Sequence, residues 1–458
     1  MAFFYQNLSA ISIPYPSVSG AEILSLDAKL VSTFSTHVHE RYYINHASLN
    51  VQNASFCNVT VTYTHPGYND TIHTQVWLPI GTWNEQMRGI GGSRWTAGIY
   101  NCWYIGDASI PQYAMMGAIR EGYAAVTTNA GHMSTNPDDW LLMSPGNVNL
   151  TLLQDLGSVS LNEAAIVGKD ITRRFYGQQP KFSYFSSCSQ GGRQVTAYYW
   201  PSFIMNKMGK HPYPCKLDAI TTAAIGACAG FDGVKNGMVT DPRFCDFDPW
   251  AVVGTTIDCS DTRAQSTSVR SCGDRGKYVM GRAALVSWSV TLVCVPFSLA
   301  TDWIRLSVKK DPTFDASNMT HEEYNAIFPL SAQELTSIPN SDNLDLSAFR
   351  QAGGKMLSFH GLADSIIPPE QIQNYYELAT SLDPDYCYGG AGVYQSGIFD
   401  AMVAWVENGT VPECLNATTS PSSANDTVKQ RLLCPYPQVA KCSGVGDTLV
   451  ASSFRCAP

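Results

Sequence analysis

Residues Phe185-Ser186-Ser187-Cys188-Ser189-Gln190-Gly191-Gly192-Arg193-Gln194 form the stretch that decides the fold. A strand-like run, residues 181–185, precedes it, and a helix-like run, residues 195–200, follows it. A serine between a strand and a helix, flanked by small residues, is the sequence form of a nucleophile elbow. The flanking residues are small because the turn is sharp and a bulky side chain would clash. The stretch therefore predicts an esterase whose nucleophile is Ser189.

The size and composition are typical of an acidic globular protein. At 458 residues the chain is long enough to bury a large core, as one domain or as a core with an insertion. Hydrophobic residues make up 45% of it and charged residues 15%, which indicates a folded chain and not a disordered one. The net charge of −9 and the pI near 5.5 argue against nucleic acid or an anionic membrane as partner.

Cysteines and glycosylation sequons indicate an oxidising compartment. The chain contains 14 cysteines, a number that favours disulfide formation in a secreted protein. Nine Asn-x-Ser/Thr sequons favour the same compartment, and together these features predict a secreted glycoprotein. The sequon asparagines are Asn7, Asn53, Asn58, Asn69, Asn149, Asn318, Asn408, Asn416 and Asn425.

The N-terminal segment does not resemble a secretion signal. Residues 1–20 contain no lysine or arginine and no continuous apolar stretch of sufficient length. A mature chain, a truncated gene sequence and a cytosolic protein with free thiols are three interpretations, and the initiator Met1 disfavours the first. We expect a secreted protein with no signal peptide in this sequence.

One uncharged run, residues 283–301, is long enough for a membrane span. Four polar residues and a proline lower its hydrophobicity, so we expect a buried segment and no membrane partner. These residues are Ser287, Ser289, Thr291, Pro296 and Ser298.

Hydrophobic patterns alternate between strand and helix over much of the chain. This alternation predicts an α/β fold with a largely parallel sheet. Between about residues 228 and 340 the pattern becomes cysteine-rich and loop-rich, which predicts an inserted lid. We expect strands at residues 56–63, 73–79, 123–128 and 355–360, and helices at residues 162–175, 370–382 and 398–407.

Four sequence blocks in order resemble the tannase/feruloyl esterase family of α/β-hydrolases. The resemblance extends over nearly the whole chain, from Gly20 to Pro437. It implies an α/β-hydrolase core at residues 1–227 and 341–458 with a cysteine-rich lid at 228–340. Members hydrolyse esters of gallic or hydroxycinnamic acids, and most are secreted. The blocks are Thr62-Tyr63-Thr64-His65-Pro66-Gly67, Cys188-Ser189-Gln190-Gly191-Gly192-Arg193-Gln194, Phe231-Asp232-Gly233-Val234-Lys235-Asn236-Gly237 and Phe359-His360-Gly361-Leu362-Ala363-Asp364.

The expected catalytic groups surround Ser189. Asp364 follows a strand-like run, where this fold places the acid that orients the histidine, although an aspartate capping a turn is the alternative. Oxyanion donors are expected from the backbone N–H of Gln190 and from the glycine-rich segment that contains Gly91 and Gly92. Glycines let a backbone N–H approach the substrate closely, and a plain glycine-rich turn is the alternative for this segment.

The catalytic base is missing from its family position. In the family, the histidine directly precedes a cysteine that is disulfide-bonded to the cysteine before the serine. Cys188 is present and Cys387 matches its partner, but Tyr386 precedes Cys387. A tyrosine, with a reference pKa of about 10, is mostly protonated near neutral pH and cannot replace the base.

Three interpretations of this loss stay open. The sequence has lost a segment that encodes the histidine, or the protein is a non-catalytic relative that keeps the fold, or another group acts as base. His360 is the best substitute because it ends a predicted strand and can face the site. A structural histidine beneath the Asp364 loop is the alternative reading of His360.

The resemblance also implies a calcium loop. Asp232, the Val234 carbonyl, Asn236 and the Met238 carbonyl match its ligand positions, and such oxygen donors suit calcium. Ala229 and Asn236 stand where the family has aspartates, so we expect a weakened calcium site; an Asp/Asn-Gly turn is the alternative. No organic cofactor is expected. The resemblance implies the disulfides Cys188–Cys387, Cys228–Cys245 and Cys434–Cys456.

The sequence as a whole predicts a serine carboxylic ester hydrolase. We expect a serine acyl-enzyme and a galloyl or hydroxycinnamoyl ester, either small or part of a plant polyphenol or polysaccharide. A non-catalytic binding protein that has lost the triad histidine is the alternative.

Overall fold

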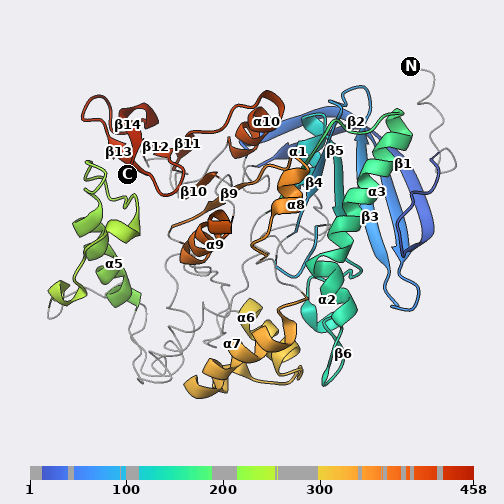
Figure 1. The fold of residues 1–458 in the computed structure, drawn as a ribbon, viewed down its shortest axis with the longest axis horizontal. Helices are drawn as coiled ribbons and strands as arrows, with labels where there is room; N and C mark the ends of the chain where they lie inside the picture. The colour runs from blue at the N-terminus through green and yellow to red at the C-terminus, as the bar shows by residue number, and fades with distance from the viewer. Residues whose placement is uncertain are drawn as a thin grey trace. The chain divides into compact units, whose positions relative to one another are not determined.

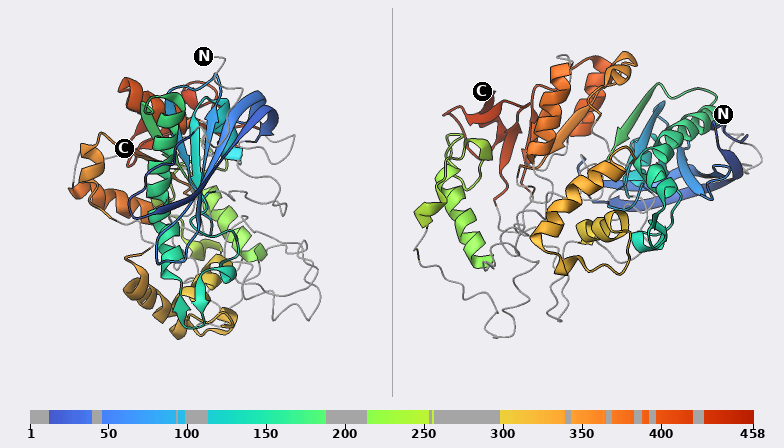
Figure 2. Two further views of the ribbon diagram at one scale, coloured as in Figure 1. Left: turned by 90° about the vertical axis from the view of Figure 1, so that its right-hand side faces the viewer. Right: turned by 60° about the horizontal axis from the view of Figure 1, so that its bottom comes forward.

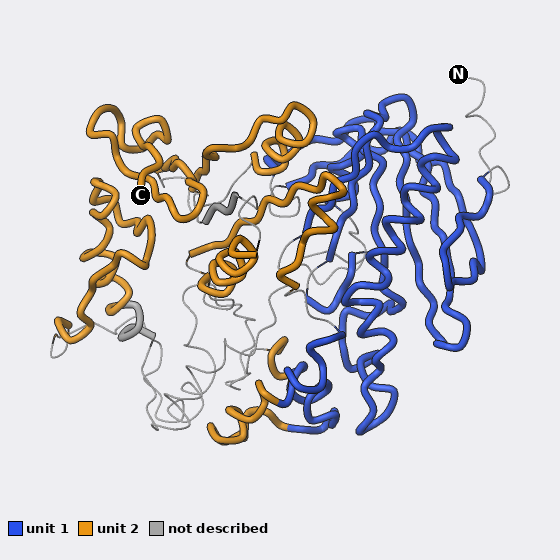
Figure 3. Tube along the Cα trace, viewed as in Figure 1, with its two compact units in different colours: residues 1–193, 302–314, 330–341 blue, residues 194–301, 315–329, 342–458 orange. Residues whose placement is uncertain are grey.

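The computed structural model describes most of the chain in two compact units (Figure 3). Unit 1 comprises residues 1–193, 302–314 and 330–341, and unit 2 comprises residues 194–301, 315–329 and 342–458. The described residues are 13–39, 46–92, 94–98, 113–187, 214–252, 255, 298–338, 343–362, 364, 369–382, 388–391, 397–419 and 427–458.

A six-stranded mixed sheet forms the centre of unit 1 (Figure 1). Its order is β1-β2-β3-β5-β4-β8; β1, β2, β3 and β5 pair antiparallel, whereas β4 pairs parallel with β5 and β8. The bounds are β1 Glu22–Val38, β2 Leu49–Thr64, β3 Ile72–Pro79, β4 Gln86–Ile90, β5 Ala124–Thr128 and β8 Phe182–Ser186.

Burial explains why these segments are strands. In β2 every second residue near the carboxyl end is fully buried, namely Val59, Val61 and Tyr63, which is the period of a strand with one face in the core. All five residues of β5 are buried, as expected for a strand covered on both faces.

Helix α3 (Val159–Tyr176) covers one face of this sheet (Figure 2). Val167 and Ile171 on the helix join the same buried cluster as Val126 on β5. Gly168 permits this approach, since a Cβ there would lie 3.1 Å from the Val126 side chain. The helix ends at Gly177, which adopts the left-handed conformation that glycine tolerates best.

A second buried cluster in unit 1 joins residues that are distant in the sequence. Leu306 and Leu335 pack with Trp140, Leu141 and Leu153. The elements of this region are the 3₁₀ turn Pro137–Asp139, β6 Leu142–Ser144, β7 Asn147–Val148, α2 Leu150–Gly157 and the π-helix Trp303–Val308, whereas α1 (Tyr113–Arg120) packs on β1 and β2 through Tyr113, Ala114 and Met116. Helices α6 (Ser298–Asp302) and α7 (His321–Leu335) contain residues of both units.

Unit 2 contains a short parallel pair of strands, helices and two antiparallel hairpins. β9 (Leu357–His360) pairs with β10 (Tyr388–Ala391), β11 (Leu415–Thr418) with β12 (Gln430–Leu433), and β13 (Val439–Cys442) with β14 (Phe454–Ala457). Its helices are α5 Pro214–Cys228, α8 Ser347–Gln351, α9 Pro369–Leu382 and α10 Ile398–Asn408, with 3₁₀ turns at Pro242–Phe244, Pro249–Val252, Ala316–Asn318 and Ala451–Ser453.

The expected elements are confirmed, but the sheet differs from its expected type. The four predicted strands lie in β2, β3, β5 and β9, and the three predicted helices in α3, α9 and α10. The sheet of unit 1 is mixed and not largely parallel, because β1, β2 and β3 follow one another through short connections that only antiparallel strands can use. The helix expected at residues 195–200 lies outside the described residues.

Two predicted disulfides are confirmed. Cys228–Cys245 and Cys434–Cys456 have Cα separations of 5.2 and 5.5 Å. Cys188 and Cys387 lie outside the described residues. No helix in the described part of the chain is long and apolar enough to cross a membrane, although residues 283–297 lie outside that part. The core-and-lid division stays a prediction: the segment 228–340 contributes residues to both units.

Candidate active site

The strands β4 and β8 bring two candidate loops of unit 1 together. They pair in parallel, with Ile90 opposite Ser186, so the segments that follow them leave the sheet side by side. The first segment begins with Gly91 and Gly92, and the second reaches Ser187, two residues before Ser189. The predicted oxyanion segment therefore lies directly beside the strand end that leads to the predicted nucleophile.

Glycine is required at the start of the first segment. A Cβ on Gly91 would lie 2.5 Å from Ser187 Oγ, and a Cβ on Gly92 would lie 2.0 Å from the Thr96 carbonyl oxygen. The Gly91 N–H donates to the Ser186 carbonyl oxygen (3.1 Å), and Ser187 Oγ donates to the Gly92 carbonyl oxygen (3.4 Å). Because the Gly91 amide is used between the strand ends, Gly92 is the better oxyanion candidate of the two. Cys188, Ser189 and Gln190 lie outside the described residues.

His360 and Asp364 are neighbours in unit 2. His360 is the last residue of β9, and the Asp364 N–H donates to the Gly361 carbonyl oxygen (2.9 Å), which forms a tight turn. His360 Nε2 lies 3.7 Å from Asp364 Oδ2, too far for a direct hydrogen bond but close enough for an ion pair when the imidazole is protonated. The predicted acid and the predicted substitute base are thus brought together.

The pairing of β10 with β9 places Tyr388 and Asp364 at opposite edges of this strand pair. Tyr388 pairs with Leu357, the first residue of β9, and Ala391 pairs with His360, the last. Asp364 therefore follows β9 at the edge where β10 ends, whereas Tyr388 begins β10 at the opposite edge. Tyr386 and Cys387 lie outside the described residues. His360 is the last histidine in the sequence, so the segment after β10 supplies none.

The predicted calcium loop forms a compact turn in unit 2. Asp232 is 1% exposed; its Oδ1 accepts from the Val234 N–H (2.9 Å) and its Oδ2 from Thr240 Oγ1 (2.9 Å). Asn236 Oδ1 accepts from the Met238 N–H (3.1 Å). These oxygens are of the type that suits a hard cation, but only Asp232 among the four predicted ligands carries a formal negative charge.

Two cationic side chains already contact this loop. Lys429 Nζ donates to the Asn236 carbonyl oxygen (2.7 Å), and Arg431 Nε lies 4.0 Å from Asp232 Oδ2. Arg431 is 3% exposed, and burial lowers its pKa although Asp232 acts in the opposite direction. The oxygen donors of the Asp232 loop suit a hard cation. Their total charge is low, as the sequence indicates.

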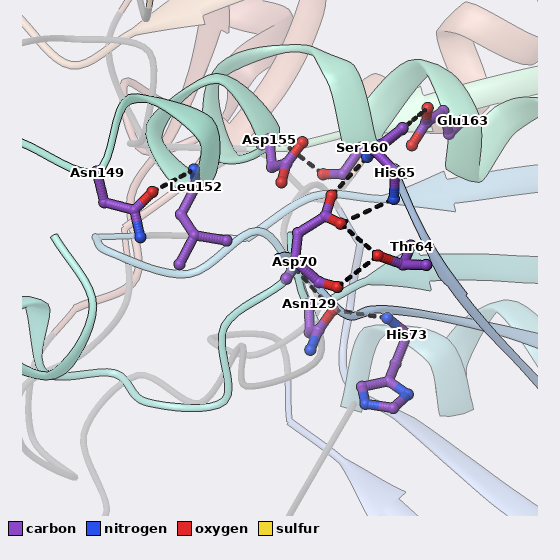
Figure 4. Close-up of polar contacts among 11 residues, drawn as sticks. Thr64, His65, Asp70, His73, Asn129, Asn149, Leu152, Asp155, Ser160 and Glu163 are labelled. Carbon is purple, nitrogen blue, oxygen red and sulfur yellow. Dashed lines mark hydrogen bonds and ion pairs between the residues drawn. The ribbon is translucent and has the colours of Figure 1, made fainter. Parts of the chain in front are cut away.

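A buried ionisable cluster in unit 1 was not found from the sequence as a site. His65 and Asp70 lie in the turn between β2 and β3, Asp155 lies on α2, and Glu163 lies on α3 (Figure 4). Burial raises the pKa of Asp155 to about 7, whereas the hydrogen bonds that the His65 ring donates to Asp70 and Glu163 raise the pKa of that imidazole against the effect of burial. Of these residues only His65 lies in one of the sequence blocks that resemble the family, and that block gave no indication of the carboxylates on α2 and α3.

His132 is a buried histidine of a different kind. Its ring stacks on Trp140 with centroids 4.1 Å apart, and its Nδ1 contacts the Ser134 carbonyl oxygen at 3.0 Å. Burial lowers its pKa to about 4. It is therefore neutral at physiological pH.

Comparison with known proteins places this site in a family. Residues 57–202 and 297–457 match the family described as tannase and feruloyl esterase. The chain is 32% identical to a probable feruloyl esterase of Arthroderma benhamiae, over 99% of this chain and 94% of the relative. The chain belongs to the tannase and feruloyl esterase family. Membership confirms the predicted family and supports carboxylic ester hydrolysis as its class of activity.

Two solved structures share the fold. A tannin acyl hydrolase from Aspergillus niger superimposes with a TM-score of 0.77 at 23% identity, covering 98% of this chain and 94% of that one. Feruloyl esterase B from Aspergillus oryzae gives 0.70 at 21% identity, covering 96% and 97%. These likenesses show that the chain shares the fold of both proteins.

Proposed function

We propose that this chain hydrolyses carboxylic esters of aromatic acids, of the galloyl or hydroxycinnamoyl type, through an acyl-enzyme on Ser189. The observation that carries the proposal is the side-by-side exit of β4 and β8, with Gly91 and Gly92 packed against Ser187. Acyl transfer needs an oxyanion donor close to the nucleophile, and this pairing favours that arrangement. Relatives named as feruloyl esterases and a tannin acyl hydrolase support the substrate class.

The proposed reaction uses few groups. Ser189 Oγ attacks the ester carbonyl carbon and loses its proton to a base, while the N–H groups of Gln190 and Gly92 donate to the developing oxyanion. Collapse breaks the C–O bond, and the leaving alcohol takes the proton. Water then attacks the acyl-enzyme with the same base, which releases the aromatic acid and restores Ser189.

His360 is the proposed base and Asp364 its orienting acid. The 3.7 Å separation of His360 Nε2 and Asp364 Oδ2 supports their partnership, and a small rotation would bring them within hydrogen-bonding distance. A non-catalytic protein that binds aromatic esters is the alternative, supported by Tyr386 at the family position of the base.

A fluorophosphonate probe and hydrolysis of methyl ferulate and methyl gallate test these roles. We expect wild-type protein to be labelled and to hydrolyse at least one ester, and Ser189→Ala to lose both, since triad nucleophiles are worth about 10⁶ in kcat. His360→Gln should abolish turnover as well, whereas His37→Gln, an exposed histidine on β1, should not.

Each outcome separates the alternatives. Wild-type protein that remains unlabelled, with tight binding of the esters, would establish the binding protein. Labelling that His360→Gln leaves unchanged would remove His360 as the base but keep Ser189 as an activated nucleophile. Restoring a Gly-His pair before Cys387 tests the lost-segment interpretation, because it should then raise the rate strongly.

We further propose weak calcium binding by Asp232, Asn236 and the carbonyl oxygens of Val234 and Met238, with a structural role. The turn geometry of Asp232 and Asn236 supports it, and the contact of Lys429 with the loop argues for low affinity. Calcium should raise the melting temperature of wild-type protein at millimolar concentration but not that of Asp232→Asn. The exposed Asp400→Asn is the matched control. Equal calcium responses of all three proteins would contradict the proposal.

Secretion as a glycoprotein is also a proposal. Five described sequon asparagines have exposed side chains, so oligosaccharide attachment would not disturb packing there. Protein expressed in a eukaryotic secretory host should lose mass on treatment with an amidase that removes N-glycans; an unchanged mass would contradict the proposal. The five asparagines are Asn53, Asn69, Asn318, Asn408 and Asn416.

A further inference from the structure

Two segments of unit 1 bring three metal-ligand side chains to one point. His65 and Asp70 come from the turn between β2 and β3, and Asp155 comes from α2 (Figure 4). One ligand atom from each of the three lies within 4.8 Å of the other two. This spacing permits all three to contact a single ion after small adjustments of the side chains.

His65 is oriented as metal-binding histidines are. Its Nε2 contacts Glu163 Oε1 at 2.7 Å, which leaves Nδ1 directed at Asp70 Oδ2, 2.5 Å away. A histidine that binds a metal through one ring nitrogen commonly donates the other N–H to a carboxylate, which fixes the tautomer and the ring. Asp70 is oriented too, because its Oδ1 accepts from Thr64 Oγ1 and from the His65 N–H, each at 2.8 Å.

Asp155 supplies an independent indication of a ligand. The residue is 2% exposed, and its Oδ2 has no hydrogen-bond partner in the described part of the chain. Ser160 Oγ donates to the backbone carbonyl of Asp155 and not to its carboxylate. A buried carboxylate oxygen without a donor is costly unless a proton or a cation neutralises it.

The charges around His65 do not balance. Two buried carboxylates, Asp70 and Glu163, contact the one imidazole, and a third, Asp155, is buried beside them. Within the described ranges no lysine or arginine forms an ion pair with any of the three. A divalent cation would supply the missing positive charge.

We propose that His65, Asp70 and Asp155 bind one divalent transition-metal ion, best matched by Zn²⁺, and that Glu163 is the positioning residue for His65. One imidazole and two carboxylates are ligands that zinc accepts, with a fourth position open to water. The ion would displace the proton between His65 Nδ1 and Asp70 and would tie the β2–β3 turn to α2. The site shares no residue with the proposed calcium loop or with the proposed ester chemistry.

Zinc titration of the full chain tests the proposal. Protein stripped with EDTA and dialysed should bind one Zn²⁺ more than Asp155→Asn does, measured by isothermal titration calorimetry and by metal analysis. Glu163→Gln should keep the stoichiometry but weaken the affinity about 10- to 100-fold, as loss of an orienting carboxylate does. His37→Gln and Asp400→Asn, at exposed residues outside the cluster, should bind as the wild type does.

A purely structural cluster gives different results. In that case Asp155→Asn would be less stable than the wild type by the same amount with and without Zn²⁺. A metal site instead gives a zinc-dependent rise in the melting temperature of the wild type that the variant lacks. Equal zinc stoichiometry in wild type and Asp155→Asn would overturn the proposal. Where that variant fails to fold, Co²⁺ added to wild-type protein decides: visible absorption that saturates at one equivalent supports the site, and a featureless spectrum overturns it.

Discussion

The Asp232 loop and the His65 cluster both bury carboxylates, but they differ in the source of positive charge. The loop has one buried carboxylate, and the chain provides Arg431 and Lys429 beside it. The cluster has three buried carboxylates and a single imidazole. The comparison teaches that a buried charge is neutralised either by a side chain of the protein or by a proton or ion from outside. A site for an external cation is therefore better sought where the side chains leave charge unbalanced.

The largest effect is expected on removing the one cationic group of the cluster. In the presence of EDTA, His65→Gln should lower the free energy of unfolding by about 3–5 kcal/mol, because Asp70 and Glu163 then remain buried without their partner. Urea denaturation measures the change, and His37→Gln should alter it by less than about 0.5 kcal/mol. A loss below about 1 kcal/mol at His65 would show that the cluster is not charged as described.

The contribution of the buried His132 to the stability of the protein should depend on pH. Burial lowers the pKa of His132 from 6.5 to about 4, so the unfolded chain binds this proton more readily than the folded one. Its contribution to stability is therefore present above pH 6.5 and lost as the pH falls toward about 4, by about 3 kcal/mol in all. Between pH 7 and 4 the free energy of unfolding of His132→Phe should change less with pH than that of the wild type. Equal changes in the two proteins would contradict the assignment.

A smaller effect is expected in the Asp232 loop. Arg431→Met should cost about 2 kcal/mol, less than His65→Gln, because Thr240 and the Val234 N–H still donate to Asp232. Thermal unfolding with and without calcium measures it. Calcium should bind this variant more tightly than wild type, since a competing positive charge is gone. Unchanged calcium affinity would indicate that Arg431 does not compete with the ion.

The fold was predictable where one short segment carries the signal. The alternation in β2 and the small, fully buried residues of β5 were found at once, since burial of every second residue or of all residues is a local pattern. The strand β1 was missed: only Leu26 and Val38 among its residues are buried, while apolar residues such as Leu24 and Leu30 are exposed. This strand adds an antiparallel pair, β1 with β2, to the mixed sheet, and the sequence pattern did not predict it.

The candidate site was predictable in part for the same reason. Gly91, Gly92 and Asp364 each follow a strand and His360 ends one, and strand ends are visible in the sequence. The contact of His65 with Glu163 joins residues 98 positions apart, and no local pattern could place α3 over the β2–β3 turn. Cys228–Cys245 and Cys434–Cys456 were inferred from their spacing together with the resemblance to a family.

The last thirty residues bear on how this protein tolerates shortening. Lys429, Lys441 and Cys442 each donate to a backbone carbonyl oxygen of residues 231–236, so the two C-terminal hairpins hold the Asp232 loop from outside. A chain that stopped before Lys429 would also lose Cys434–Cys456 and leave Asp232 open to water. Proteolytic trimming or a premature stop at this end would therefore remove the contacts that hold the Asp232 loop, which lies some two hundred residues earlier in the sequence.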